Sequence, residues 1–411
     1  MKASEFPASL QFRCCIAGGG PAGMMLGLLF ARAGIDVVVL EKHVDFLRDF
    51  RGDTIHPSTL EAMWELGILE KLLEIPHQRI PQLKAQIGND EIVLADFCHI
   101  AAKCRFIALM PQWEFLNFLA EQARRYSTFH LVMKAEVTGL IEGAGRIAGV
   151  RVTTPGGVQE IRADLVVGAD GRNSVVRNFS GLKVDELGAP IDVLLMRLSK
   201  KPTDPELALR FDRGKILATL DRGDYWQCGF LIPKGSSEEI RKKGIEYLRA
   251  ALAEIAPFLK DRVNELPDWN AIKLLTIKVD RLRKWYRPGL LCIGDAAHAM
   301  SLIGGVGINL AIQDAIATAN ILTVPLAEGC VTVDHLAKVQ RRRALPSRLT
   351  QAFQVMVHKQ LIAPILATPE QMQLSWPQRR ILRSKLGRRI RGRIVGIGFR
   401  PEHVKSPEVY L

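Results

Sequence analysis

Short apolar runs along the chain predict buried parallel strands. Four of them consist mainly of Val, Ile, Leu, Ala and Cys: 14–17, 36–40, 165–167 and 290–293. Continuous apolar runs of this length are typical of strands that are covered on both faces. Between the first two runs, residues 22–33 have the pattern of a helix, and Gly34 is a suitable residue to end it. The order strand, helix, strand predicts a βαβ unit and hence an α/β fold.

Further patterns predict the remaining elements. Helices are expected at 57–66, 113–126 and 236–256. Strands are expected at 130–134, 162–167, 193–197, 215–220 and 225–232, and within 76–105. The four residues from Asp221 to Asp224 have the composition of a turn between the last two strands of the 193–232 region.

A glycine-rich turn joins the first strand to the first helix. Gly18, Gly20 and Gly23 have the G-x-G-x-x-G spacing, and Pro21 and Ala22 lie between them. In a dinucleotide-binding turn such glycines allow a tight bend, a close approach of the backbone to a pyrophosphate, and tight packing of the helix on the strand. The alternative is a glycine-rich turn that binds no ligand.

Glu41 ends the second strand, and Lys42 follows it. An acidic side chain at this place can accept hydrogen bonds from ribose hydroxyls, and its charge repels a 2′-phosphate. Glu41 and Lys42 are therefore assigned to a site for the adenosine part of FAD or NAD rather than NADP.

Two later motifs also follow predicted strands. Asp170 comes after the run 165–167, where Asp-Gly favours a tight turn and Ser174 is placed to cap a helix. Taken alone, this is ordinary turn chemistry. Asp295 comes after the run 290–293, at the strand end where α/β sheets bind ligands.

A glycine loop then leads into an expected helix. Gly304, Gly305 and Gly307 precede Ile308 and Asn309, where the helix begins. A helix N-terminus offers backbone N–H groups and the positive end of the helix dipole. These residues are expected to hold the O2 side of a reduced, anionic flavin ring.

Together, the three segments resemble the signature motifs of class A FAD-dependent monooxygenases, the family of para-hydroxybenzoate hydroxylase-like aromatic hydroxylases. The resemblance runs from residue 12 or so to residue 325 or so. It implies that Glu41 holds the adenosine ribose, that Asp170 belongs to a motif shared by FAD and NAD(P)H, and that Asp295 contacts the ribityl or pyrophosphate part. It also places Arg51 near the flavin phosphates and Gln112 on the FAD chain.

The resemblance implies an α/β architecture with a Rossmann-like FAD/NAD(P)-binding domain, an inserted α+β substrate domain and a helical C-terminal tail. The FAD-binding domain is expected to be discontinuous, with segments 1–75, 106–185 and 281–325. The substrate domain is expected to comprise 76–105 and 186–280, and the helical basic C-terminal region 326–411.

The family's reaction implies FAD as cofactor and NADH or NADPH as co-substrate. Reduced flavin forms a C4a-hydroperoxyflavin with O2, which hydroxylates an aromatic or polyketide-like small molecule. The flavin carries this chemistry, so no side chain is assigned as catalytic. Strand alternation requires about half of the candidate pocket residues to point away from the pocket. These candidates are Met196, Arg197, Phe211, Tyr225, Trp226 and Gln227.

Three other functions stay open. Trp226 and the Ile232-Pro233 pair match part of a W-x-W-x-I-P halogenase motif. A flavin-dependent prenyl-lipid reductase would fit a membrane-bound C-terminal helix. Leu302 stands where the family usually has proline, and a proline there would stiffen the loop beside the flavin. Because of this departure, a non-catalytic FAD-binding protein is the third open function. His298 is expected to pack or hydrogen-bond locally rather than to act as an acid or base.

Composition indicates a cytoplasmic enzyme. The seven cysteines lack the spacing of a disulfide framework, which indicates a reducing compartment. The His and Cys residues show no metal-ligand spacing, so no metal site is expected. The N-terminus has no apolar signal core, and no run of 18 apolar residues predicts a membrane span.

The net charge of +13 is concentrated in residues 379–400, which contain nine basic residues and no acidic one, interleaved with apolar residues. The preferred interpretation is a helix that packs its apolar face on the domain, with its arginines in water. Peripheral contact with an anionic membrane is the alternative. No nucleic-acid-binding module accompanies the basic run, so nucleic acid is not an expected partner. The run Arg341–Arg343, which ends near Pro346, is expected to lie on a solvated helix face. A monomer or homodimer is expected.

Overall fold

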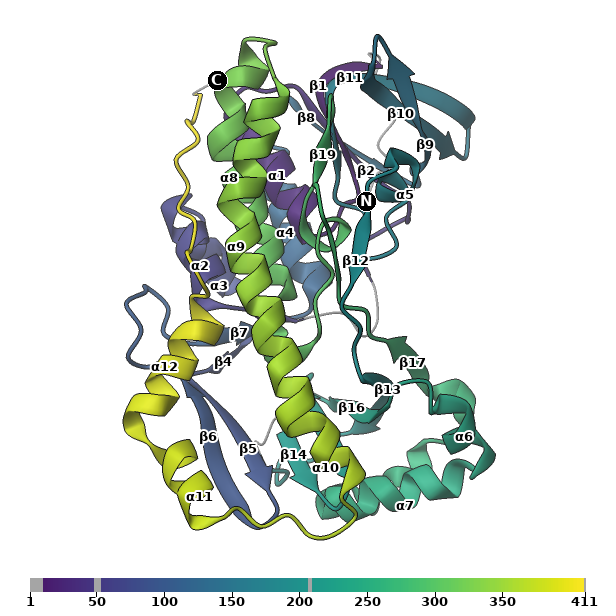
Figure 1. The fold of residues 1–411 in the computed structure, drawn as a ribbon, viewed down its shortest axis with the longest axis vertical. Coiled ribbons are helices and arrows are strands. Elements are labelled where there is room, and N and C mark those ends of the chain that lie inside the picture. Colours follow the sequence, from purple (N-terminus) through teal and green to yellow (C-terminus); the bar gives the residue numbers. More distant parts are fainter. Residues whose placement is uncertain (1–9, 48–52, 206–208, 410–411) are drawn as a thin grey trace.

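The computed structural model describes residues 10–47, 53–205 and 209–409. Two sheets lie one beyond the other along the long axis of the molecule, and the long helix α9 (Val333–Val357) runs beside both (Figure 1). This α/β arrangement with a helical C-terminal region confirms the predicted fold class. The expected domain boundaries stay a prediction.

The first sheet has eight strands and contains the predicted βαβ unit. Its main path has the order β19-β20-β11-β1-β2-β8, and β1 pairs in parallel with β2 on one side and with β11 on the other. The carboxyl end of β1 is therefore a switch point, the place where open α/β sheets bind ligands. The strands are β1 (Gln11–Ala17), β2 (Val37–Glu41), β8 (Phe129–Met133), β9 (Glu136–Gly143), β10 (Arg146–Thr154), β11 (Gly157–Gly168), β19 (Tyr286–Arg287) and β20 (Leu290–Cys292).

Helix α1 (Pro21–Arg32) begins at the proline of the glycine turn and packs against α4 (Gln112–Ala123) and α8 (Gly307–Ala327). Among the described residues, one helical segment, Ile303–Ala327, has the length and apolar composition of a membrane span. Of the most apolar stretch of this segment, 78% is buried inside the protein. The contacts of α8 with α1 and α9 account for this burial, as expected of a core helix.

The second sheet has seven strands in the order β17-β13-β16-β15-β14-β5-β6. All its neighbours are antiparallel except β14 and β5, which pair in parallel. Its strands are β5 (Gln82–Ile87), β6 (Asp90–Asp96), β13 (Ile191–Ser199), β14 (Leu209–Asp212), β15 (Lys215–Asp221), β16 (Tyr225–Pro233) and β17 (Lys273–Thr276). The sheet thus joins a hairpin from 76–105 to strands more than a hundred residues later.

One face of the second sheet is covered by helices. The prediction of a single helix at 236–256 is wrong, because the segment forms two helices, α6 (Ser237–Lys242) and α7 (Ile245–Ile255). Gly244 separates them with a φ of +84°, a left-handed conformation that favours glycine and ends a helix.

Short elements connect the two sheets. A three-stranded sheet contains β3 (Thr54–Ile55), β4 (Gln78–Ile80) and β7 (Ile107–Leu109), and a two-stranded one contains β12 (Val184–Glu186) and β18 (Asp280–Leu282). Helices α2 (Pro57–Glu65), α3 (Leu69–Glu74) and α5 (Val175–Ser180) complete this part, with short 3-10 turns at 257–259, 263–265 and 269–271.

The C-terminal region is helical and returns to the first sheet. After α9 come a π-turn (His358–Ile362), α10 (Ala363–Ala367), α11 (Trp376–Arg383) and α12 (Lys385–Gly396). The final segment runs back past α8 to α1 (Figure 1), where Val409 N–H donates to the carbonyl oxygen of Arg32 at 2.9 Å. Pro346 lies inside α9, which continues through it.

The prediction that 379–400 packs its apolar side on the domain is only half right. Leu382 and Val395 pack inward, against the second sheet and the β6 hairpin. Ile381, Leu386 and Ile390 point to solvent instead. The amphipathic pattern of this segment therefore does not match its packing on the protein.

Candidate functional site

The glycine turn between β1 and α1 combines tight packing with one open position. A Cβ at Gly18, whose φ is +105°, would lie 2.5 Å from the carbonyl oxygen of Ala169. A Cβ at Gly23 would lie 2.0 Å from the carbonyl oxygen of Gly18. A Cβ at Gly20 would meet nothing within 4 Å. Gly18 and Gly23 thus allow strand and helix to approach, while Gly20, the N-cap of α1, leaves space beside the helix N-terminus for a phosphate group.

Glu41 lies beside this turn, at the end of β2. Its carboxylate accepts hydrogen bonds from the N–H of Gly19 at 3.0 Å and the N–H of His43 at 3.1 Å. These two bonds orient the side chain at the switch point, where a ribose hydroxyl could reach it. Lys42 is exposed next to it.

The carboxylate of Asp170, at the carboxyl end of β11, is hydrogen-bonded to backbone N–H groups. It accepts hydrogen bonds from the N–H groups of Val175 at 2.7 Å and Val176 at 3.1 Å, and so caps α5. Burial raises the pKa of Asp170. Ser174 caps the same helix, as predicted, by accepting from the N–H of Arg177 at 2.9 Å. The second motif therefore holds the turn against which Gly18 packs.

Asp295 lies in a 3-10 turn (Gly294–Ala296) directly after β20. Its carboxylate is half-buried and lies 4.0 Å from the guanidinium of Arg172. A Cβ at Gly294 would be 3.1 Å from the Cβ of Ala22, in the first turn of α1. The structure therefore brings all three predicted motifs to the N-terminus of α1.

The glycine loop before α8 packs against Thr54 at Gly305 and has open space at Gly307. The hydroxyl of Thr54 donates to the carbonyl oxygen of Gly305 at 2.9 Å, and a Cβ at Gly305 would clash with Thr54 at 2.5 Å. A Cβ at Gly307 would meet nothing within 4 Å. Ile308, the next residue, is buried.

Asn309 is buried and uses its amide inside the protein. Its Oδ1 accepts hydrogen bonds from the N–H of His56 at 3.0 Å and the hydroxyl of Thr59 at 2.6 Å. Asn309 thus ties the start of α8 to α2. A ligand contact at Asn309 would come through its backbone N–H rather than through this oxygen.

Gln112 is the first residue of α4, and its N–H donates to the carboxylate of Asp53 at 3.2 Å. Arg51 lies outside the described residues. Both stay predictions as ligands of the FAD chain.

A buried ion pair joins the second sheet to the segment just before β3, and no pattern in the sequence indicates it. Asp53, just before β3, bonds the guanidinium of Arg222 in the β15–β16 turn, and both side chains are buried. Arg222 also donates to Oε1 of Gln227 at 2.9 Å and lies 6.0 Å from the ring centre of Trp113. Burial raises the pKa of Asp53 to about 6, although the charge of Arg222 acts in the opposite direction.

The strand register separates the candidate pocket residues by face. Met196 and Trp226 belong to the core under α7 and so point away from the first sheet. Arg197 and Gln227 are opposite each other on β13 and β16 and therefore share the other face, on which Gln227 meets Arg222. Phe211 packs in the core of that second face. The face that carries Gln227 is defined here as the inner face; through Arg222 it reaches Asp53, which also accepts a hydrogen bond from the N–H of Gln112.

A second unanticipated feature is a buried charge cluster behind the third motif. Asp314 on α8 accepts hydrogen bonds from Gly294 N–H at 3.0 Å and Arg343 Nε at 2.9 Å, and its carboxylate lies 2.6 Å from His298 Nε2. Arg343 also approaches Glu402 at 3.4 Å. The expected local role of His298 is confirmed. The expected solvated position of Arg343 is wrong, because only 1% of this residue is exposed.

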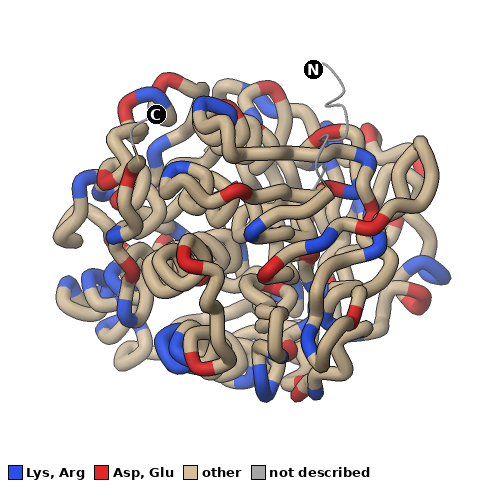
Figure 2. Tube along the Cα trace, turned by 90° about the horizontal axis from the view of Figure 1, so that it is seen from above, with Lys and Arg blue, Asp and Glu red and all other residues tan. Residues whose placement is uncertain are grey.

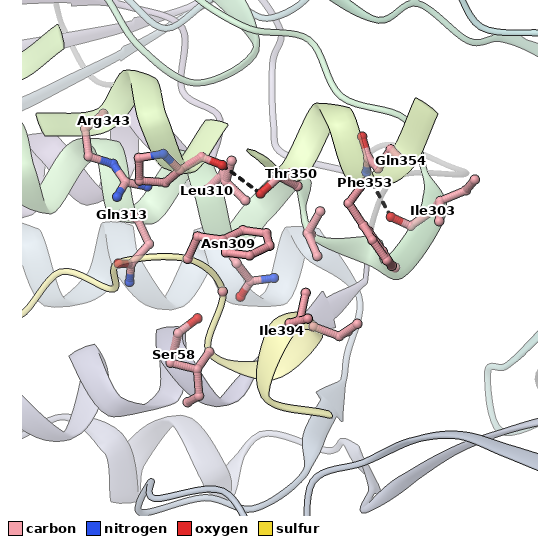
Figure 3. A pocket seen from close by; sticks show the side chains of 17 residues that line it. Ser58, Ile303, Asn309, Leu310, Gln313, Arg343, Thr350, Phe353, Gln354 and Ile394 are labelled. Carbon is pink, nitrogen blue, oxygen red and sulfur yellow. Dashed lines mark hydrogen bonds between the residues drawn. The ribbon is translucent and has the colours of Figure 1, made fainter. Parts of the chain in front are cut away.

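A small cavity lies between α8, α9 and the end of α12 (Figure 3). Phe353 and Ile394 are among the residues that line it, and Gln354 donates to the carbonyl oxygen of Ile303 at 2.9 Å beside it. Its volume of about 30 Å³ holds roughly two water molecules and no aromatic ring. The cavity lies against the glycine loop at Ile303 and Gly304. Because it is too small for an aromatic ring, it is not the substrate site.

Comparison with known proteins agrees with this geometry. The sequence profile of the FAD binding domain family matches residues 11–352. The chain is 30% identical over 354 residues to 6-methylpretetramide 4-monooxygenase of Streptomyces rimosus, covering 85% of this chain and 84% of that protein. The chain belongs to the FAD-dependent monooxygenase family. It is thus an FAD-dependent oxidoreductase that uses a nicotinamide nucleotide as co-substrate.

Solved structures with the same fold include PqsL, a probable FAD-dependent monooxygenase from Pseudomonas aeruginosa. Its TM-score is 0.73 at 23% identity, over 87% of this chain and 100% of that one. The anhydrotetracycline hydroxylase OxyS from Streptomyces rimosus has a TM-score of 0.69 at 20% identity, over 94% of this chain and 76% of that one. At these identities the likeness concerns the fold alone.

The residues at the N-termini of α1 and α8 fit FAD. Gly20 and Gly307 leave space where a side chain would block a ligand, and both lie at helix N-termini that attract negative charge. Glu41 and Asp295 provide carboxylates near the same end of α1. Among the described residues, no group of three or more His, Cys, Asp or Glu side chains is arranged to hold a metal ion.

Proposed function

We propose that this monooxygenase hydroxylates a phenolic, polyketide-like aromatic molecule with O2 and NADH or NADPH, and that the substrate binds between the FAD motifs and the inner face of the second sheet. The proposal rests on the contact of Arg222 with Asp53 and Gln227. This contact joins the inner face of the second sheet to the segment before β3, next to the start of α4. The 30% identity to 6-methylpretetramide 4-monooxygenase supports a polyketide-like substrate.

The inner face combines small apolar positions with hydrogen-bonding groups at its end, beside the part that Ile362 and Ile365 cover. Ala218 lies opposite Gly229 at its centre, and Leu220 lies opposite Gln227. Small residues at the centre suit a planar ring system, while the apolar neighbours exclude water.

Arg222 is suited to bind a phenolic or enolic oxygen. Its Nε and Nη1 are buried, and neither has a hydrogen-bond partner among the described residues. Buried donors are nearly always satisfied, so a substrate oxygen is a natural partner. Asp53 fixes the guanidinium from the other side and offsets its charge.

Bound and reduced FAD would supply the activation of O2 and the delivery of one oxygen atom to the ring. The protein's part is to hold the ribose at Glu41, to present the N-termini of α1 and α8 to the negatively charged parts of the cofactor, and to orient the substrate at Arg222. These are positioning and electrostatic contributions.

The proposal is tested by incubating the purified protein with FAD, NADH or NADPH and a panel of phenolic polyketides in labelled O2. We expect substrate-dependent oxidation of the nucleotide and a product that carries one labelled oxygen atom. Halide-dependent product without label would indicate a halogenase, and a reduced lipid product without label would indicate a reductase. Nucleotide oxidation that no substrate accelerates would contradict hydroxylation of this substrate class.

Leu302 provides a second test of catalytic competence. Its φ of −69° matches proline, and among the described residues its N–H makes no hydrogen bond. We expect Leu302→Pro to retain FAD, to stabilise the protein by about 0.4–1 kcal/mol, and to raise substrate-dependent turnover by stiffening the loop before α8. Flavin content, thermal unfolding and coupled product formation check this. A fall in flavin content would show that the loop conformation differs from the one described.

A further inference from the structure

Helices α11 and α12 expose large apolar side chains to solvent. Their exposed fractions range from 50% to 70%, in Ile390, Ile381, Leu386 and Trp376. Leu386 and Ile390 are one helical turn apart on α12, and the exposed Arg389 and Arg393 share that side of the helix. We call the side chains of these six residues the outer face. Single exposed apolar residues are normal, but a group on one short helical hairpin indicates a binding surface.

The outer face is exposed because α12 docks on the protein through other residues. A Cβ at Gly392 would lie 2.0 Å from the carbonyl oxygen of Asp96 on β6. Arg388 pairs with Asp96 at 3.4 Å, and Arg391 donates to the carbonyl oxygen of Leu94, also on β6. Gly392, Arg388 and Arg391 therefore contact the protein together with Val395 at the end of the helix, while Leu386 and Ile390 are left outside. This packing fixes the apolar side chains on the outside.

The charge of this segment is uniformly positive. Basic and acidic residues are interspersed over most of the molecule (Figure 2), but no acidic residue occurs between Glu370 and Glu402. Arg379 and Arg383 both pair with Asp90 on β6. On the outer face, Arg389 and Arg393 form no ion pair with an acid among the described residues; Arg389 lies 3.2 Å from a ring nitrogen of His99.

We propose that the outer face binds the surface of a membrane that contains anionic lipids. Aliphatic and Trp side chains enter the headgroup boundary, while the arginines beside them attract phosphate groups. With 12 residues, α12 is about 18 Å long and can lie flat in the interface. A second copy of this chain fits less well, because a two-fold contact through the same surface would oppose like charges.

Co-sedimentation of the FAD-loaded protein with lipid vesicles tests the proposal. We expect binding to vesicles of phosphatidylcholine with phosphatidylglycerol, weakened by added salt, and little binding to phosphatidylcholine alone. The double variant Arg389→Glu with Arg393→Glu should weaken partitioning by about 30-fold or more. Leu386→Ser with Ile390→Ser should weaken it by about tenfold or more.

Matched controls change the same chemistry elsewhere. Leu345→Ser with Leu349→Ser alters two exposed leucines with the same spacing on α9, and Lys242→Glu with Lys243→Glu reverses two exposed charges near the end of α6. Both should bind vesicles as the unchanged protein does. Equal binding to both vesicle types, equal loss in the controls, or self-association that the Arg389 and Arg393 reversal abolishes would each overturn the proposal. None of these readouts depends on substrate turnover, so they are independent of the proposed reaction.

Discussion

Replacing Asp314 with alanine is expected to destabilise the protein by about 3–5 kcal/mol, because it removes the nearer of the two carboxylates that pair with the buried guanidinium of Arg343. Gly294 N–H would lose its acceptor at the same time, and His298 its carboxylate neighbour. Burial acts to raise the pKa of Asp314, but His298 and Arg343 outweigh it and lower the pKa below the usual value. The carboxylate is thus ionised at neutral pH, and its loss removes a charge from the cluster.

Thermal unfolding of the holoenzyme measures this effect, and a fall in apparent Tm on the order of 5 °C or more is expected. Asp334→Ala is the matched control, since Asp334 is an exposed aspartate in the first turn of α9, where the expected cost is below about 1 kcal/mol. The double variant Asp314→Leu with Arg343→Met removes both charges and should recover part of the loss. An unchanged Tm in Asp314→Ala would show that the cluster does not hold α8, α9 and the tail together.

The buried charge cluster around Asp314 is a part of the structure that local sequence patterns do not predict. The turn from Gly18 to Gly23 and the cap at Ser174 were predictable because glycine conformation and capping act over a few residues. Asp314 and Arg343 lie 29 residues apart on different helices, and nothing in their local pattern joins them. The sequence predicts Arg343 in solvent because a run of arginines on a helix is usually exposed.

The substrate side illustrates the same limit. Alternation predicted that half of the candidate pocket residues point away, but only the strand register shows that Met196 and Trp226 are the ones that do. The Asp53–Arg222 pair joins residues 169 positions apart, across two sheets. The break at Gly244, by contrast, is marked in the sequence by the glycine itself, a residue that lowers the expectation of one continuous helix.

Gly20→Val is expected to abolish retention of FAD while the protein still folds. The backbone at Gly20 has φ −75° and ψ −176°, an extended conformation that valine adopts readily, and a Cβ there meets no protein atom within 4 Å. The branched side chain would fill the space before α1 and keep a diphosphate from the N–H groups of the helix. Losing two charge-assisted hydrogen bonds of about 1.5–3 kcal/mol each weakens binding by about a hundredfold or more.

The ratio of flavin to protein after gel filtration, and a titration of the apoprotein with FAD, measure the effect. Gly156→Val is the control, since Gly156 is an exposed turn glycine at the opposite end of β11 from Asp170, and a Cβ there would meet only Thr154 at 3.7 Å. Glu41→Ala is an independent variant that removes the expected ribose contact without adding bulk, and it should also lose flavin. If Gly20→Val and Glu41→Ala both purify with full flavin, the cofactor does not lie at the N-terminus of α1, and the fit of the three motifs to FAD is wrong.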